Sequence, residues 1–194
     1  MANEFYALLG RMRYITRWGL MRNSFSENIQ EHSHQVAVLA HALALIRRDI
    51  LQLPGPSPER CAVAGLYHDA SEILTGDMPT PIKYYNPAMK NAYKQVEQIA
   101  NRHLLDLLPL PLQAAYAPYL LEDDGSVAPI VKAADKLAAY IKCIEEQKAG
   151  NAEFESAAKQ TMASMQDMAL PELNWFIAEC LPAFSRNLDE LHIL

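Results

Sequence analysis

The sequence predicts an all-α fold, a single-domain helical bundle over residues 1–194. Apolar residues recur at steps of three and four along nearly the whole chain, whereas the strict alternation of a half-buried strand is hard to find. Apolar side chains make up 51% of the residues and charged side chains 21%, the usual proportions of one globular domain. We find no internal repeat, low-complexity tract or evident linker.

Two amphipathic segments open the chain. The first is expected to form a helix over about Asn3–Arg13, and the second a helix over about Glu27–Leu51 with Ser26 as its N-cap. The second segment carries one apolar stripe, made of Ile29, Val36, Leu39, Leu43 and Ile46.

The third expected helix has the strongest start signal in the sequence. Ser57 is suited to cap it, and Pro58 occupies the first helical position, where a missing N–H costs nothing. We expect this helix to continue to about Leu74. The next segment, TGDMPTP at 75–81, is expected to be a loop because neither of its prolines can continue a helix.

The remaining chain is expected to be helical with short breaks. Gly150 is the expected C-cap of the longest of these helices, and Pro182 is expected to kink or split the last one. The expected helices are 87–108, 112–121, 127–150, 152–168 and 171–191, with a polar turn at 122–126.

Charge and cysteine content restrict the partners and the compartment. The 17 basic and 23 acidic side chains leave a net charge of −6, which argues against polymeric nucleic acid or an anionic membrane as the main partner. The three cysteines are far apart and lack metal-site spacing, so we expect reduced thiols. The N-terminal residues lack the pattern of an export signal, and a cytoplasmic protein is expected.

A short segment, GLYHDASEILTGD, concentrates the groups that carry chemistry. It contains His68, Asp69, Glu72 and Asp77. On a continuous helix His68 and Glu72 lie one above the other, and Asp69 is rotated by roughly 100°. A metal ion at the rim of that helix would touch His68 and Asp69, and Glu72 would point into the same space. Taken singly, each of these residues has an ordinary structural explanation.

Two other helices each offer one further ligand. His32 shares its helix face with the apolar stripe, whereas His34 is rotated by roughly 200° from it, so periodicity selects His32 as the inward residue. Asp135 lies at the border between an apolar and a solvent-exposed face of its expected helix. Two imidazoles and two carboxylates suit a transition-metal ion such as Mn²⁺, Co²⁺, Fe²⁺ or Zn²⁺.

The order His32, then His68-Asp69, then Asp135 resembles the H…HD…D signature of the HD-domain phosphohydrolase superfamily. Longer segments are similar to its bacterial branch of YfbR-like 5′-deoxynucleotidases, from the first helix through the Asp135 helix. These segments are RMRYITRWGLMRN, ENIQEHSHQVA, YHDASEILTGDMPTPIKYYN and KAADKLAAYIKCIEE.

The resemblance implies a role for each matching residue. One divalent metal ion, with Co²⁺ or Mn²⁺ favoured and Fe²⁺, Zn²⁺ or Cu²⁺ possible, would be bound by His32, His68, Asp69 and Asp135. Glu72 and Asp77 would be the acid and base candidates, with the assignment open, and Asp77 would also contact substrate. Arg17 and Trp18 would hold the phosphate and select deoxyribose over ribose. The implied reaction converts deoxyribonucleoside 5′-monophosphates to deoxyribonucleosides and inorganic phosphate.

Two alternatives remain at this stage. The chain is an HD hydrolase for another nucleotide class, such as triphosphates or cyclic dinucleotides, or a non-catalytic HD-like binding module. Binuclear members need additional histidines between the HD pair and the last aspartate, where only His103 is found, so one metal ion is expected. The resemblance also implies a homodimer, for which the tyrosines at 84, 85, 93, 116 and 119 offer interface side chains.

Overall fold

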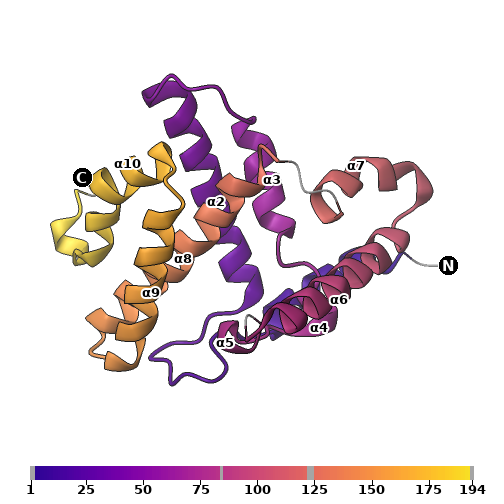
Figure 1. Cartoon of the computed structure of the whole chain (residues 1–194), viewed down its shortest axis with the longest axis horizontal. Helices are drawn as coiled ribbons and strands as arrows, with labels where there is room; N and C mark the ends of the chain where they lie inside the picture. The colour runs from indigo at the N-terminus through magenta and orange to yellow at the C-terminus, as the bar shows by residue number, and fades with distance from the viewer. Residues whose placement is uncertain (1–2, 84, 122–124, 193–194) are drawn as a thin grey trace. The chain divides into compact units, whose positions relative to one another are not determined.

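The computed structural model describes residues 3–83, 85–121 and 125–192 of the chain. The regular elements within these ranges are helices, which confirms the all-α prediction (Figure 1). The described part also contains an isolated antiparallel bridge between Thr16 and Asn28. The chain divides into two compact units, the first made of residues 1–34 and 66–125 and the second of residues 35–65 and 126–194. The predicted single-domain organisation stays a prediction.

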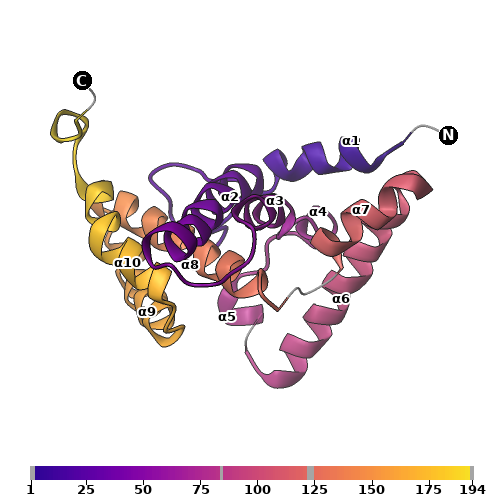
Figure 2. The same ribbon diagram turned by 90° about the horizontal axis from the view of Figure 1, so that it is seen from above.

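The first unit is built around α6, Pro87–Asp106, and α7, Leu110–Leu120, which pack against each other (Figure 2). The chain enters this unit through α1, Phe5–Leu9, which continues as a 3-10 turn, η1, over Gly10–Tyr14. The short helix α4, Glu72–Thr75, packs on both η1 and α6. A fully buried Phe5 joins the apolar cluster of this unit with Ala70, Leu104, Leu105, Leu108 and Leu120.

The second unit is organised by α8, Ala128–Lys148, which packs along α9, Glu155–Asp167 (Figure 1). The 3-10 turn η3, Ala152–Phe154, connects these two helices. The C-terminal region contains α10, Pro171–Glu179, followed by the 3-10 turns η4, Leu181–Ser185, and η5, Leu188–Glu190, so the expected split near Pro182 is confirmed.

Helices α2, Ile29–Leu45, and α3, Pro58–Tyr67, each contribute residues to both units. The end of α2 widens into a π-helical turn, η2, over Ile46–Ile50. Gly65 of α3 is required for close packing within the second unit, because a Cβ atom there would come within 2.7 Å of the Cα atom of Ala37. None of the described helices is both long and apolar enough to cross a bilayer.

The main correction to the expected elements is the end of α3. The helix was expected to reach about Leu74, but it ends at Tyr67, and residues 68–71 form a turn before α4. Hydrogen bonds from Ala70 N to Tyr67 O at 3.0 Å and from Glu72 N to Asp69 O at 3.0 Å replace the four-residue ladder with three-residue steps. The relation between His68 and Glu72 expected on a continuous helix is therefore wrong.

Three smaller expectations are also corrected. The start of α2 is capped by Asn28 rather than Ser26, since Asn28 Oδ1 accepts from Glu31 N at 3.0 Å and Glu31 Oε2 accepts from Asn28 N at 3.2 Å. The expected loop at 75–81 ends early because Thr80 begins the short helix α5, Thr80–Lys83.

The third of these corrections concerns the tyrosines offered for an interface. Tyr93 is only 5% exposed, and its hydroxyl lies 3.3 Å from Thr75 Oγ1, so it belongs to the interior. Tyr85 is 79% exposed, and Tyr84 lies outside the described residues, as do the turn residues Glu122, Asp123 and Asp124.

A buried charge network closes the C-terminal end of α8. Lys142 is 2% exposed and Glu146 is fully buried, and Lys142 Nζ donates to Glu146 Oε1. Asn151 Nδ2 donates to the other oxygen, Oε2, at 2.8 Å. Gly150, with φ +82, makes the left-handed turn that brings Asn151 back to this position, close to the C-cap role expected for it.

This network predicts a large stability cost for loss of the Glu146 carboxylate. Glu146→Ala leaves the Lys142 ammonium buried without this carboxylate and should lower the free energy of unfolding by about 3–5 kcal/mol. Urea denaturation followed by circular dichroism measures the loss. Glu145→Ala, at the exposed neighbouring position, is the matched control and should change stability by no more than about 0.5 kcal/mol. Equal effects of the two variants would contradict the prediction.

Candidate metal and phosphate site

Backbone pairing places Arg17 and Trp18 beside the start of α2. The bridge between Thr16 and Asn28 holds the segment after η1 against the residues that precede α2. Arg17 donates its backbone N–H to the carbonyl oxygen of Glu27 at 2.9 Å. His32 lies about one helical turn into α2. The pairing therefore places residues 17 and 18 beside the first turn of that helix.

The carboxylate of Asp69 is the point at which the site converges. Its Oδ2 atom lies 3.0 Å from His68 Nε2 and 3.7 Å from His32 Nε2. The same oxygen accepts a hydrogen bond from Arg17 Nη1 at 3.4 Å. The side chain of His32 is fully buried, whereas those of His68 and Asp69 are 13% and 18% exposed. Two imidazoles, a carboxylate and a guanidinium thus share a small space with limited access to solvent.

The neighbours of Asp69 keep it ionised. Burial by itself would raise the pKa of this carboxyl group, but the charge and hydrogen bond of His68, together with His32 and Arg17, lower it well below its usual range. A carboxylate that remains ionised at neutral pH accepts hydrogen bonds only and is the form that a cation requires.

The pKa values of Glu72 and Asp77 are shifted in the opposite direction, above their usual values. Burial, reinforced by the negative charges of Asp69 and Asp77, raises the pKa of Glu72 to about 9. Burial also raises the pKa of Asp77, although Arg17 and a hydrogen bond from the backbone of Trp18 act in the other direction. Among the described residues, no hydrogen-bond partner reaches Glu72 Oε2. Both carboxyl groups therefore lie within the electrostatic reach of Asp69, and Glu72 has an oxygen left for another molecule.

Arg17 and Trp18 occupy a constrained segment of the backbone. Trp18 has φ +59, a conformation that bulky residues rarely adopt and that costs about 1–3 kcal/mol. The guanidinium carbon of Arg17 lies 6.0 Å from the centre of the indole ring, within the range of a cation–π contact. Trp18 is thus held in an irregular loop and is not a packing residue at a helix end.

Glu27 is a site residue that the sequence analysis missed. Its side chain is largely buried, and Oε2 accepts from Trp18 Nε1 at 2.7 Å and from Arg17 Nε at 3.3 Å. Its Oε1 lies 3.7 Å from His32 Nδ1. Burial would raise the pKa of Glu27, but His32, Arg17 and Trp18 together lower it. A carboxylate five residues before a buried histidine gives a weak signal in the sequence, and only the bridge to residue 16 makes it part of the site.

Helix α2 confirms the periodicity argument, and α8 presents Asp135 as expected. His34 is exposed, whereas His32 points inward. Asp135 belongs to the second unit, where it is partly buried at the edge of the apolar face of α8. The members of that face, Ile130, Val131, Ala134, Leu137, Ala138 and Ile141, are all buried.

The donor atoms of the first unit fit a divalent transition-metal ion. Two ligands that each lie about 2.1 Å from one ion are about 3.0 Å apart at a right angle and about 3.4 Å apart at a tetrahedral angle. The separation of 3.0 Å between His68 Nε2 and Asp69 Oδ2 falls within this range, and the 3.7 Å to His32 Nε2 is slightly longer. Imidazole nitrogen and carboxylate oxygen are also the ligand types that such ions accept.

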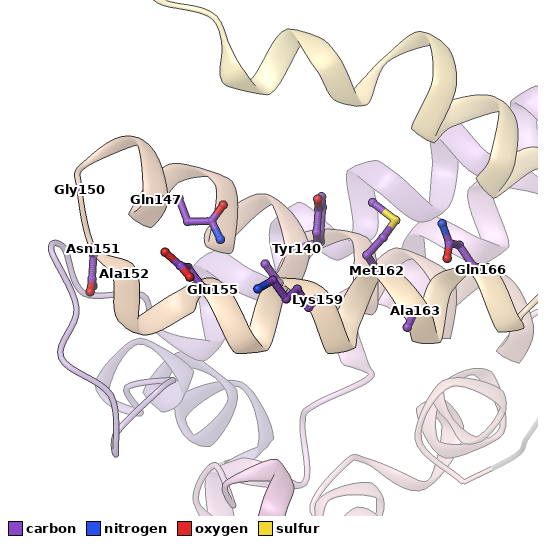
Figure 3. A pocket seen from close by; sticks show the side chains of 11 residues that line it. Tyr140, Gln147, Gly150, Asn151, Ala152, Glu155, Lys159, Met162, Ala163 and Gln166 are labelled. Atoms are coloured by element: carbon purple, nitrogen blue, oxygen red, sulfur yellow. The ribbon is translucent and has the colours of Figure 1, made fainter.

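A pocket in the second unit lacks the imidazole groups that lie around Asp69. It has a volume of about 760 Å³ and lies in the second unit along α8 and α9, where Gln147, Glu155 and Lys159 line it (Figure 3). Glu155 is the only carboxylate among the described residues of its lining, which includes no histidine or cysteine. A single carboxylate is not a metal-ligand set, so the described lining of this pocket offers no alternative to the residues around Asp69.

Several 5′-deoxynucleotidases match this chain over almost its whole length. A 5′-deoxynucleotidase of Photobacterium profundum is 48% identical over 193 residues, covering 97% of this chain and 98% of the relative. A 5′-deoxynucleotidase of Erwinia tasmaniensis is 47% identical over 192 residues, covering 97% and 96%. The model of the YfbR-like 5′-deoxynucleotidases matches residues 4–184.

Solved structures with the same fold are more distant in sequence. An HD-domain phosphohydrolase from Listeria innocua superposes with a TM-score of 0.76 at 23% identity, covering 93% of this chain and 88% of that chain. The HD phosphohydrolase DatZ of cyanophage S-2L, bound to dA and one catalytic Zn²⁺ ion, gives a TM-score of 0.62 at 19% identity, covering 91% and 95%. The fold is that of HD-domain phosphohydrolases, and the family model and the relatives agree that the chain belongs to the YfbR-like 5′-deoxynucleotidase family.

Proposed function

We propose that this protein is a metal-dependent 5′-deoxynucleotidase. It hydrolyses deoxyribonucleoside 5′-monophosphates to deoxyribonucleosides and inorganic phosphate, and it discriminates against ribonucleotides. The observation that carries the proposal is the convergence of His32, His68 and Arg17 on the carboxylate of Asp69. This arrangement joins a metal-ligand set to a phosphate-binding cation in a protein whose net charge of −6 would otherwise repel anions.

One divalent ion, Co²⁺ or Mn²⁺ by preference, is the proposed cofactor, with Fe²⁺, Zn²⁺ and Cu²⁺ as other possibilities. His32, His68 and Asp69 would hold it together with Asp135 from the second unit. When bound, such an ion neutralises phosphoryl oxygens and lowers the pKa of a coordinated water. The position of Asp135 at the edge of an apolar helix face supports its role, because a carboxylate there is shielded from bulk solvent.

Arg17 and Trp18 are the proposed substrate-binding pair. The guanidinium of Arg17 can hold a phosphate group through two parallel hydrogen bonds. The indole of Trp18, fixed in its left-handed segment, would form a wall against the 2′ position of the sugar, so that an added hydroxyl group meets a clash and an unsatisfied polar contact.

Glu72 is the proposed general acid. It is a buried carboxyl group with Oε2 available, and a protonated carboxyl there can donate to the leaving O5′ atom. Asp77 is the proposed base and a further substrate contact, since the backbone of Trp18 donates to it and so keeps it next to the substrate-binding segment. We also propose a homodimer in the cytoplasm, without polymeric nucleic acid or membrane as a partner.

The metal-binding proposal predicts different behaviour for two histidines on the same helix. His32→Ala should weaken Mn²⁺ or Co²⁺ binding by at least about a hundredfold because it removes a ligand. His34→Ala is the matched control, since His34 is exposed two residues away and should leave affinity unchanged. Isothermal titration of metal-stripped protein measures both. Wild-type protein that binds neither ion and shows no shift in melting temperature would favour the binding-module alternative.

The ligand role of Asp135 is testable separately. Asp135→Asn removes the charge while keeping the shape of the side chain, and it should lower metal affinity and hydrolysis together. Lys136→Gln, at the next position on α8, is the control and should alter neither. Metal affinity at the wild-type level in Asp135→Asn would remove this residue from the ligand set.

The acid role predicts that Glu72→Gln separates chemistry from binding. The variant should reduce kcat by about 10²–10⁴-fold because the amide cannot supply the proton. Metal affinity should stay within a factor of about three of the wild type, since Glu72 is not among the proposed ligands. Phosphate release from dAMP at saturating Co²⁺ measures kcat. A kcat close to that of the wild type would exclude Glu72 as the acid.

The selectivity proposal predicts that Trp18→Ala narrows the difference between dAMP and AMP. The ratio of their kcat/KM values should fall by at least about tenfold, mainly because hydrolysis of AMP improves relative to that of dAMP. Trp175→Ala serves as the control for loss of a tryptophan outside the site. Equal kcat/KM values for the two substrates in the wild-type enzyme would disprove the selectivity, and preferred hydrolysis of triphosphates would support the other nucleotide class.

A further inference from the structure

Glu27 contacts three members of the proposed site but has no role in the reaction described above. We propose that Glu27 is a positioning residue that fixes the guanidinium of Arg17 and the indole of Trp18 in the orientation that binds phosphate and selects the sugar. This inference rests on the proposed function, because it assumes that Arg17 and Trp18 contact the substrate.

The contacts of Glu27 are those of a residue that orients its neighbours. Its Oε2 atom accepts hydrogen bonds from Trp18 Nε1 at 2.7 Å and from Arg17 Nε at 3.3 Å. The two side chains follow each other in the chain, so one oxygen aligns both. Oε1 lies 3.7 Å from His32 Nδ1, so the same carboxylate also lies beside a third residue of the site.

The backbone of Trp18 requires such a restraint. A tryptophan at φ +59 is strained, and it persists only where surrounding contacts hold it in place. The side chain of Glu27 supplies one such contact at the indole N–H. The backbone of the same residue supplies another, because its carbonyl accepts from Arg17 N at 2.9 Å. Substitution of the side chain removes the first contact and leaves the second.

Arg17 is oriented from two directions. Glu27 engages Nε and Asp69 engages Nη1, at 3.3 Å and 3.4 Å, and the side chain is only 13% exposed. A planar guanidinium held at two nitrogens has a fixed plane, which is what recognition of a phosphate group requires. Loss of Glu27 would leave the charge of Arg17 intact but would free its plane to rotate.

If Glu27 acted only through its negative charge, its substitution would change anion binding in the opposite direction. Glu27 is a negative group beside a phosphate-binding site, so its neutralisation should strengthen anion binding if Coulomb attraction alone decides. If orientation decides, neutralisation should weaken anion binding although the site becomes more positive. The sign of the change in KM therefore distinguishes the two explanations.

The test uses Glu27→Gln in the full-length, metal-loaded enzyme. Glutamine matches the size of glutamate but removes the charge and one acceptor oxygen. We expect KM for dAMP to rise about tenfold, the dAMP-to-AMP ratio of kcat/KM to fall about tenfold, and inhibition by inorganic phosphate to weaken, with a smaller change in kcat. An unchanged or lower KM with unchanged selectivity would overturn the inference.

Two further variants test whether the effect is specific to the position and the length of the Glu27 side chain. Glu31→Gln is the matched control, because Glu31 is an exposed carboxylate in the first turn of α2, four residues after Glu27, and glutamine can still complete the capping pair with Asn28. It should leave KM and selectivity unchanged. Glu27→Asp keeps the charge but shortens the side chain by one methylene, and it should also lower selectivity. If Glu27→Gln does not fold, as judged by circular dichroism, retention of full selectivity by Glu27→Asp overturns the inference.

A measurement without metal or substrate separates this inference from the proposed function. The chain has two tryptophans, so Trp175→Phe leaves Trp18 as the only indole emitter. In that background Glu27→Leu, which leaves no acceptor for Trp18 Nε1, should shift the emission maximum to longer wavelength because the indole loses this hydrogen bond. An unchanged spectrum would overturn the restraint of Trp18 by Glu27. A wild-type enzyme inactive on every deoxynucleotide would instead refute the proposed function, and the spectrum would still decide whether Glu27 restrains Trp18.

Discussion

The site depends on the ionised carboxylate of Asp69, which is shielded from solvent and surrounded by groups that favour its charge. Burial of a carboxylate is unfavourable unless nearby cations and hydrogen-bond donors compensate for the lost hydration. His32, His68 and Arg17 supply that compensation from three segments of the first unit. The same grouping provides nitrogen and oxygen donors at separations that suit one metal ion. Structural stability and metal binding therefore impose a common requirement on these residues.

The way an acidic protein can hold a phosphate group also follows from this arrangement. A net charge of −6 opposes anion binding at long range, so the attraction must be local. In the proposed site Arg17 would provide it, and two carboxylates, Glu27 and Asp69, lie against this guanidinium. They reduce its net field and at the same time fix its plane. Such a site relies on the geometry of its donors more than on the strength of its positive potential.

Asp135, the remaining proposed ligand, lies on a well-packed helix of the second unit. The apolar face of α8 is buried over its whole length, and α9 packs along it. The Lys142–Glu146–Asn151 network then closes the end of this helix without leaving the carboxylate oxygens of Glu146 unsatisfied. The backbone that carries Asp135 is thus part of a well-packed helix, which is the kind of support that a metal ligand requires.

The sequence by itself determined the helical class, most helix positions and the inward orientation of His32, because these depend on periodicity and on local signals such as the proline at 58. The HD segment also indicated His68, Asp69, Glu72 and Asp77, and the family resemblance implied Arg17 and Trp18. The structure places all six of these residues in one unit. Only the tertiary structure decided that α3 ends at Tyr67, since no glycine or proline marks the turn at 68–71. It likewise decided the left-handed backbone of Trp18. It also decided the contacts of Glu27, because the pairing of Thr16 with Asn28 places Arg17 and Trp18 beside this carboxylate. Pairing between distant residues leaves no periodic pattern in a single sequence, and this is the physical reason that these features could not be predicted.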